Sequence, residues 1–183
     1  MEYAFVLSPV GELLLAGDRG ALRVLHFTRG SKAGSVRPGW VENAPVFRET
    51  ARQLRLYFDR KLREFDLPLA PDGTVFQQAV WAELRRIPYG ETISYGELAR
   101  RIGNPAASRA VGLANGANPI AIVIPCHRVI GASGKLTGFG GGLDVKRKLL
   151  ELEGPATSFE WESGGELPVQ ASAEPPVSAR GQR

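Results

Sequence analysis

The sequence predicts a two-domain protein in which a small α/β domain precedes a mostly helical domain. Short apolar runs separated by Gly, Pro and Asp fill the beginning of the chain, which is typical of antiparallel strands. From about residue 74 to about residue 154, apolar residues recur instead at helical spacing. The turn-forming triplet Pro71-Asp72-Gly73 lies between the two patterns. We therefore expect one domain at residues 1–72 and a second at residues 73–154.

The first domain should combine an antiparallel sheet with one helix. Apolar runs at residues 3–7, 12–16 and 22–27 are joined by short sequences that contain glycine, so we expect three antiparallel strands. Apolar side chains recur at helical spacing over residues 45–62, which predicts an amphipathic helix. A further short strand is expected at residues 65–69.

The second domain should begin with three helices. Thr74 and Gln77 form a capping box that opens a helix running to residue 87. Ser94 and Glu97 repeat this motif before a short helix that ends near residue 101. Asn104-Pro105 then starts a helix to residue 117, because Asn is a good N-cap and Pro fits the first helical position. Two helices joined so tightly predict a helix-turn-helix, and an ordinary helical hairpin is the alternative.

The helix expected at residues 105–117 has an unusual composition, because Arg109 is its only charged residue. A helix that reads bases in the major groove needs polar side chains aimed at base edges. Small side chains instead allow close approach to DNA in the minor groove, with Arg109 as a protruding wedge. They would equally suit packing against a core, so both interpretations stay open. The small residues are Ala106, Ala107, Ser108, Ala110, Gly112, Ala114 and Gly116.

Residues 120–124 lead into the part of the chain where we expect the chemistry. This apolar, mostly β-branched run predicts a strand buried on both faces, which Pro125 ends. Cys126, the only cysteine, follows directly. A lone buried cysteine is commonly a small hydrophobe, but the polar sequence Cys126-His127-Arg128 does not suit a plain core strand. Cys126 is therefore a candidate nucleophile.

A nucleophilic cysteine needs a base or a positive environment, because an unperturbed thiol is mostly protonated at neutral pH. His127 and Arg128 could supply both. Neighbouring side chains in extended backbone point to opposite faces, so we expect a water molecule to relay the proton from Cys126 to His127. Glu153, near the end of the last predicted helix, is the best candidate for fixing the His127 tautomer.

The glycine-rich sequence at residues 137–143 matches neither a phosphate-binding loop nor a dinucleotide fingerprint. It predicts a backbone that closely approaches another surface. Val145, Leu149 and Leu152 then mark a helix that Gly154-Pro155 ends. Residues 155–183 are rich in Gly, Pro, Ser, Ala and Glu, so we expect a largely disordered tail.

Composition narrows the class of protein. Residues 73–154 carry ten basic and six acidic side chains, a surplus that suits a polyanion but is also common on ordinary surfaces. One cysteine excludes an intramolecular disulfide, and together with two histidines it is too few for a dedicated zinc site. The N-terminus has no basic signal-peptide segment, and no apolar run approaches the roughly 20 residues of a membrane span. We expect a cytoplasmic protein with no membrane partner.

Several motifs in order resemble the O6-alkylguanine-DNA alkyltransferase family. The main one is Pro-Cys-His-Arg-Val-Ile at residues 125–130, which resembles the active-site signature of that family. Residues 1–72 are similar only in general pattern. The resemblance implies a ribonuclease H-like first domain and a winged helix-turn-helix-like second domain. Further similar segments, at compatible spacing, are residues 93–99, 103–105, 108–112, 118–119, 138–145 and 149–154.

The resemblance implies irreversible transfer of an alkyl group from O6-alkylguanine in double-stranded DNA to Cys126, after the nucleotide is flipped out of the helix. His127 would act as the water-mediated base, Glu153 would orient it, and Asn118 would brace the site. No cofactor is required, because a thiolate and a protonatable leaving group suffice. The thioether product is stable, so each molecule should act only once. We expect the protein to be a monomer.

The resemblance also implies how DNA and the base are held. Tyr95 would donate a hydrogen bond to the flipped base, and Arg109 would fill the gap in the base stack. The base pocket would be lined by Tyr95, Val129 and Gly140. Further DNA contacts would come from Ser94, Ala106, Ala107, Ser108, Ala110, Gly112 and Arg128.

Other functions fit the sequence less well. A sensor of alkyl lesions would have Trp in place of Cys126, and a methylation-responsive regulator would carry a second DNA-binding module that residues 1–72 lack. A cysteine hydrolase normally has its histidine far from the nucleophile in sequence. O4-alkylthymine stays open as a second substrate.

Overall fold

The computed structural model describes residues 1–154 and 169–170. Its first three strands form the antiparallel sheet that the sequence predicts, in the order β3-β2-β1. Two short strands pair with the outer side of β1, one parallel and one antiparallel, so the complete sheet is mixed. The expected disordered tail otherwise lies outside the described residues. The strands are β1 (Glu2–Ser8), β2 (Gly11–Asp18), β3 (Ala21–Phe27), β4 (Val41–Glu42) and β7 (Val169–Gln170).

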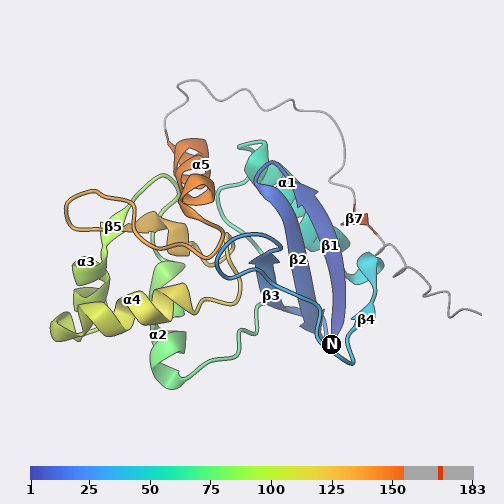
Figure 1. Ribbon diagram of the computed structural model, residues 1–183, viewed down its shortest axis with the longest axis horizontal. Helices are drawn as coiled ribbons and strands as arrows, with labels where there is room; N and C mark the ends of the chain where they lie inside the picture. Colours follow the sequence, from blue (N-terminus) through green and yellow to red (C-terminus); the bar gives the residue numbers. More distant parts are fainter. Residues whose placement is uncertain (155–168, 171–183) are drawn as a thin grey trace, which may run out of the picture.

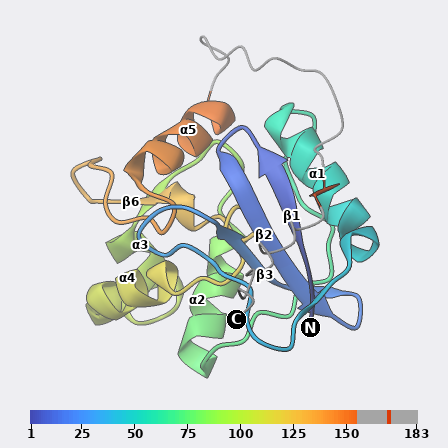
Figure 2. The ribbon, with the colours of Figure 1, turned by 45° about the vertical axis from the view of Figure 1, so that its right-hand side comes forward.

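Strand β2 is the buried centre of the sheet. Residues 13–17 are all buried, with no alternation between the two faces. This pattern arises because both faces are covered. One face, with Leu13 and Leu15, belongs to the same core as α1 (Arg48–Phe58) and the second domain, and the other face, with Leu14, is lined by the loop that follows β3 (Figures 1 and 2). Among the described residues, no helix has the length and the apolar character that crossing a bilayer requires.

The helices of the second domain are α2 (Val75–Leu84), α3 (Tyr95–Arg101), α4 (Ser108–Gly116) and α5 (Leu143–Glu153). The capping box of Thr74 and Gln77 is present in both directions, at 3.2 and 2.9 Å. Ser94 caps α3 by accepting from the Glu97 amide, but the Glu97 carboxylate pairs with arginines instead of closing the box. Asn104 makes no capping hydrogen bond, and a 3-10 turn, Pro105–Ala107, precedes α4.

Two predictions for the first domain were wrong, one in the existence of a strand and one in the bounds of a helix. Residues 65–69 form no strand and contribute only a single bridge between Leu22 and Leu69. The helix expected at residues 45–62 is a 3-10 turn, Ala44–Phe47, followed by α1, which ends at Phe58. Arg60 has a φ of 59°, and an α-helix cannot continue through a residue in the left-handed region.

The strand predicted at residues 120–124 is also absent, although all five residues are buried. Ile120 forms one parallel bridge with Leu25 at the free edge of β3, and the chain then turns. Ile122 has a φ of 69°, which is a rare conformation for a β-branched residue. The sheet of the first domain thus carries the turn that leads to Cys126.

The glycine-rich segment does approach another surface closely. A Cβ atom at Gly141 would lie 2.6 Å from the Phe27 ring, so only glycine fits there. The Phe27 and Phe139 rings meet edge to face with centroids 5.5 Å apart. This loop therefore joins the second domain to strand β3.

Candidate functional site

Asn118 holds the buried turn that leads to Cys126. Its side-chain amide donates to the Ile124 carbonyl at 2.8 Å, and its side-chain carbonyl accepts from the Ile120 amide at 3.0 Å. Both residues are buried, and their segment has only one bridge to the sheet, so an unpaired backbone group here would cost free energy. Asn118 therefore fixes the conformation of the backbone from which Cys126 follows.

Cys126 begins a 3-10 turn, Cys126–Arg128, rather than continuing in extended backbone. The expectation of extended backbone at Cys126 and His127 was therefore wrong, although neighbouring side chains also point in different directions in a 3-10 turn. The thiol side chain is nearly buried, and Asn115, itself buried, donates to the Cys126 carbonyl at 3.4 Å. Burial raises the pKa of the Cys126 thiol, while the Asn118 side chain and the positive charge of Lys146 act in the opposite direction.

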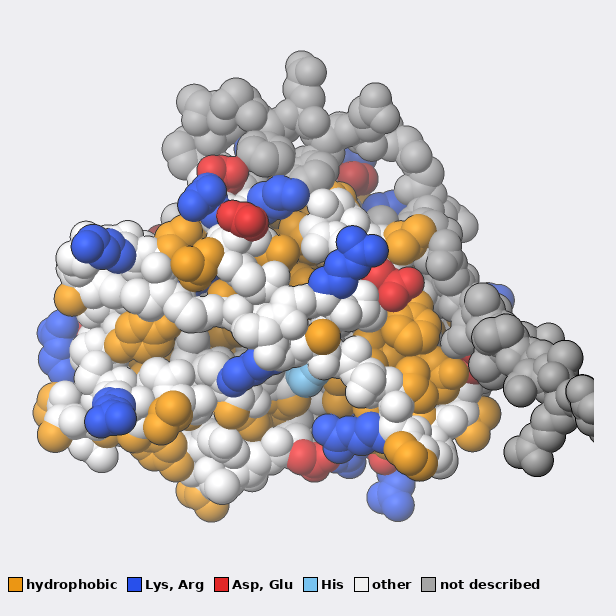
Figure 3. Space-filling model, in the orientation of Figure 1, with side chains coloured by type: hydrophobic (Ala, Val, Ile, Leu, Met, Phe, Trp, Pro, Cys, Tyr) orange, Lys and Arg blue, Asp and Glu red, His pale blue; other side chains and the backbone are white. Residues whose placement is uncertain are grey.

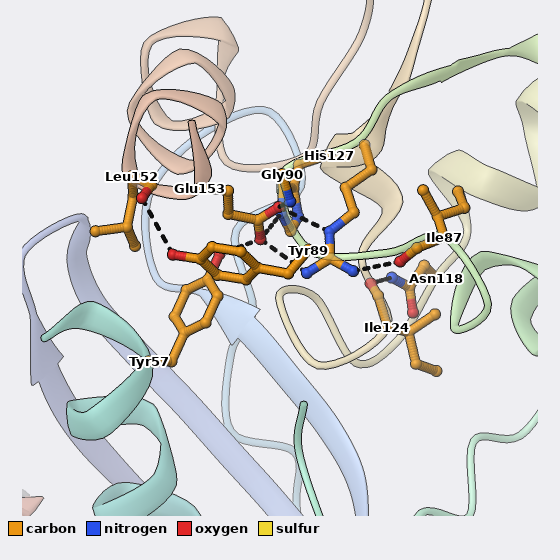
Figure 4. Close-up of polar contacts among 10 residues, drawn as sticks. Tyr57, Ile87, Tyr89, Gly90, Asn118, Ile124, His127, Leu152 and Glu153 are labelled. Atoms are coloured by element: carbon orange, nitrogen blue, oxygen red, sulfur yellow. Dashed lines mark hydrogen bonds and ion pairs between the residues drawn. The ribbon is translucent and has the colours of Figure 1, made fainter. Parts of the chain in front are cut away.

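His127 and Glu153 form a fully buried pair, with Nε2 and Oε1 2.8 Å apart (Figure 4). Burial would raise the pKa of Glu153, but interactions with His127 and Arg128 outweigh it and hold that pKa well below its usual range. Burial lowers the pKa of His127, and Glu153 offsets part of this effect. An ionised carboxylate only accepts hydrogen bonds, so Nε2 carries the proton and Nδ1 is the basic nitrogen. Nδ1 is buried and has no hydrogen-bond partner within the described residues.

Arg128, which we expected to contact DNA, lies in the interior of the protein. Its side chain is buried, with Nε and Nη2 donating to the two Glu153 oxygens at 2.7 and 2.9 Å. Nη1 donates to the Ile87 carbonyl at 2.6 Å. The prediction that Arg128 contacts DNA was therefore wrong, because the guanidinium is used in the interior. Its charge is also largely offset by Glu153, so it does not supply the positive environment expected for Cys126.

Lys146 is a buried cation that sequence reasoning missed. Its side chain is fully buried, and Nζ donates to the carbonyls of Val129 and Thr137 at 2.7 and 2.8 Å. It thereby ties the strand after the Cys126 turn, β6 (Val129–Ile130), to the glycine-rich loop. A signal was present, because Lys146 precedes Leu149 by three positions and so lies on the buried face of its helix.

A cavity of about 320 Å³ opens beside Cys126, between the two domains. Asn118, Cys126 and Gly140 line it from the second domain, while His26 and Lys32 line it from the first. Lys32 also donates to the Gly116 carbonyl at the C-terminus of α4. The space-filling view shows a histidine side chain in a hollow of this face with basic side chains around it (Figure 3).

Two residues expected in the base pocket, Tyr95 and Val129, are not part of the lining of this cavity. Val129 is fully buried in β6, and its carbonyl accepts from Lys146. The Tyr95 hydroxyl accepts from the Thr137 hydroxyl at 3.2 Å. Its own hydrogen therefore stays available for donation to another acceptor.

Apart from Arg128, the expected DNA-contacting residues lie at the N-cap of α3, in the 3-10 turn before α4 and in α4 itself. Trp81 holds α4 in place by donating from its indole nitrogen to the Ala114 carbonyl at 2.9 Å. Arg109 is exposed and has no hydrogen bond or ion pair within residues 1–154. Leu113, on the same face of the helix, is 72% exposed. Ala106 and Ala110 are exposed, while Ser94, Ala107, Ser108 and Gly112 are partly buried.

No group of three or more His, Cys, Asp or Glu side chains in the described part of the chain could hold a metal ion.

Two family models match most of the chain. Residues 1–71 match the ribonuclease-like domain of 6-O-methylguanine DNA methyltransferase, and residues 75–155 match its DNA binding domain. The chain belongs to the 6-O-methylguanine DNA methyltransferase family. This finding confirms the predicted resemblance and the predicted combination of an α/β domain with a helical DNA-binding domain.

Relatives of this methyltransferase family member cover nearly all of its described residues. The methylated-DNA–protein-cysteine methyltransferase of Methanosarcina acetivorans is 59% identical over 84% of this chain and 99% of its own length. That of Mycolicibacterium paratuberculosis is 57% identical over 84% of this chain and 92% of its own length. The crystal structure of Mycobacterium tuberculosis OGT in complex with DNA has a TM-score of 0.79 and 53% identity, covering 85% of this chain and 96% of that one.

Proposed function

We propose that this protein repairs DNA by moving an alkyl group from O6 of guanine onto Cys126 in a single turnover. The observation that carries this proposal is a buried thiol, followed directly by a histidine whose Nε2 is fixed by Glu153 and whose Nδ1 has no partner among the described residues. Such a histidine can accept the thiol proton through Nδ1, by way of a water molecule. The chain supplies all of these groups itself, so no cofactor takes part.

The reaction begins when the Cys126 thiol loses its proton to His127. Sγ then attacks the alkyl carbon, the S–C bond forms, and the O6–C bond breaks. The proton taken from the thiol is returned to the departing guanine, so no net charge accumulates in the buried site. Gly140 lines the pocket for the base, whereas Tyr95 lies outside its lining in this structure. The Tyr95 hydroxyl hydrogen is free to donate to a base that reaches it, which would make the guanine a better leaving group. The thioether cannot be hydrolysed by these groups, so each molecule reacts once.

The substrate is double-stranded DNA that contains O6-alkylguanine. The small residues of α4 allow close approach to the minor groove, and the exposed Arg109 enters the base stack in place of the flipped nucleotide. The charged side chains visible over α3 and α4 are mainly Lys and Arg (Figure 3), which favours sequence-independent phosphate contacts. We infer that the protein acts as a monomer in the cytoplasm, where its one cysteine stays reduced.

The test is intact-mass measurement and peptide mapping after mixing the protein with duplex DNA that contains O6-methylguanine. Each molecule should gain one methyl group, on Cys126, and then be inert. Cys126→Ser should abolish transfer while retaining DNA binding, because an alcohol is much harder to deprotonate than a thiol. Repeated turnover, or a methyl group on any other residue, would refute the proposal.

A further inference from the structure

Tyr57 brings a hydroxyl group from the ribonuclease-like domain to the carboxylate of Glu153. It lies in the last turn of α1, is fully buried, and donates to Glu153 Oε1 at 2.7 Å (Figure 4). The two residues are 96 positions apart in sequence. The nearby Arg60 guanidinium also donates to the Glu151 carbonyl at 3.1 Å, so the end of α1 contacts the end of α5 at two points.

The hydroxyl of Tyr57 and the ring of His127 use the same oxygen atom. Oε1 of Glu153 accepts from Tyr57, His127 and Nη2 of Arg128, while Oε2 accepts from Nε of Arg128 and, at 3.3 Å, from the Gly90 amide. A carboxylate with five donors has its rotation and its charge distribution fixed from several directions. The direction in which Glu153 holds the His127 ring therefore depends in part on a residue of the other domain.

Packing leaves the Tyr57 ring little freedom to move. Its centroid lies 5.3 Å from that of Phe65 and 6.1 Å from that of Tyr89, in tilted and edge-to-face contacts. Burial and the Glu153 carboxylate raise the pKa of Tyr57 well above its usual value, so the hydroxyl stays protonated and remains a donor. A rigid, permanently protonated donor is suited to positioning a carboxylate.

We propose that Tyr57 is a positioning residue for alkyl transfer, through which the ribonuclease-like domain holds Glu153 and thereby orients His127. This inference rests on the proposed function, in which His127 takes the Cys126 proton. The first domain is then part of the machinery for proton transfer as well as the support for the Cys126 turn.

The removal of one hydroxyl should change the pH dependence of the reaction. Without the Tyr57 donor, Glu153 becomes a stronger acceptor for the His127 N–H, so the pKa of His127 rises. As the pH is lowered, His127 then becomes protonated, and stops acting as a base, at a higher pH than in the wild type.

The charged and titratable groups that face the pair of His127 and Glu153 come from four parts of the chain. They are Tyr57 from α1, Tyr89 after α2, Cys126 and Arg128 from the 3-10 turn, and Lys146 from α5.

The test compares Tyr57→Phe with Tyr89→Phe in single-turnover methyl transfer from duplex DNA between pH 5.5 and 8.5. Tyr89 is a matched control, because its ring packs against Tyr57 but its hydroxyl donates to the Leu152 carbonyl at 3.1 Å. Tyr57→Phe should lower the plateau rate by about three- to tenfold and move the acid limb to higher pH. Tyr89→Phe should leave both unchanged. Rates are normalised to the fraction of molecules that can be methylated, so partial unfolding does not mimic the effect.

A second comparison asks whether Tyr57 acts through His127. In a His127→Gln background, adding Tyr57→Phe should change the residual rate by less than about twofold, because the route through Glu153 no longer leads to a base. Equal profiles for Tyr57→Phe and Tyr89→Phe would overturn the inference. So would a Tyr57→Phe effect that persists at full size without His127. If the wild-type protein itself transferred no methyl group to Cys126, the proposed function would fail instead.

Discussion

Lys146 is a buried cation for which residues 1–154 supply no carboxylate partner, and its hydrogen bonds go to two backbone carbonyls. Burial lowers the pKa of Lys146, so keeping a positive charge in this position makes folding less favourable. That charge favours the thiolate of Cys126, as the electrostatic interaction between the two groups indicates. Lys146 therefore takes the part that the sequence had assigned to Arg128.

Replacement of Lys146 by Met should slow the reaction of Cys126 without removing its base. The pKa of the thiol should rise, and the rate of Cys126 alkylation by iodoacetamide at neutral pH should fall on the order of tenfold, because the thiolate is the reactive form. Lys148→Met is the matched control, since Lys148 lies on the exposed side of the same helix. Equal rates for both variants and the wild type would exclude an electrostatic role for Lys146.

At the scale of single residues, the sequence could identify groups but not all of their contacts. His127 and Glu153 were chosen from their chemistry, and the fold does bring them together. Tyr57 could not be found in this way, because its position in an apolar helix face signals only burial. Arg128 was misplaced for a related reason, since a basic residue beside a nucleophile in sequence need not face it in space.

At the scale of elements, signals that depend on local hydrogen bonds were the more reliable ones. The Thr74 capping box is set by residues three positions apart, and the helix begins where the sequence indicates. The apolar run at residues 120–124 indicates burial but not conformation. The predicted burial was right, whereas the predicted strand is absent. Ile122 has a positive φ in a turn held by Asn118 and by the bridge between Ile120 and Leu25, and a run of apolar residues gives no sign of such a turn.

Helix α4 should contribute to extrusion of the base and not to activation of the thiol. Arg109→Ala should slow repair of duplex DNA by at least about tenfold, because flipping a nucleotide out of the stack costs a few kcal/mol. The reaction of the Arg109→Ala variant with O6-methylguanine as a free base should be nearly unchanged, since no base has to be unstacked. Arg85→Ala, which removes an exposed charge outside α4, controls for the loss of net charge. Equal slowing of both substrates by Arg109→Ala would place Arg109 in the active-site electrostatics instead.

At the scale of the whole molecule, the reactive turn is held from both domains. Strand β3 pairs with Ile120, Phe27 packs on the glycine-rich loop, and Tyr57 reaches Glu153. The two domains were visible in the sequence as a change of periodicity, but the contacts between them join residues far apart in the chain. The sequence therefore predicts the domains better than it predicts how the first domain completes the site.

The stability of the whole molecule should fall as the pH is lowered from 7.5 to 5.5. The folded protein holds the pKa values of His26 and His127 below the usual 6.5, in both cases mainly by burial. The unfolded chain therefore takes up protons that the folded protein does not, so the stabilisation is complete above about pH 6.5 and is lost as the pH falls below it. Glu153, whose pKa is depressed, adds a separate loss of stability only below its usual value of 4.5.

Melting temperatures of the wild type, His26→Gln and His127→Gln over this pH range test the assignment. Each kcal/mol of lost stability should lower the melting temperature by roughly 2–4 °C. Each substitution should reduce the slope, and a wild-type melting temperature that is flat between pH 7.5 and 5.5 would show that neither histidine is held neutral by the fold.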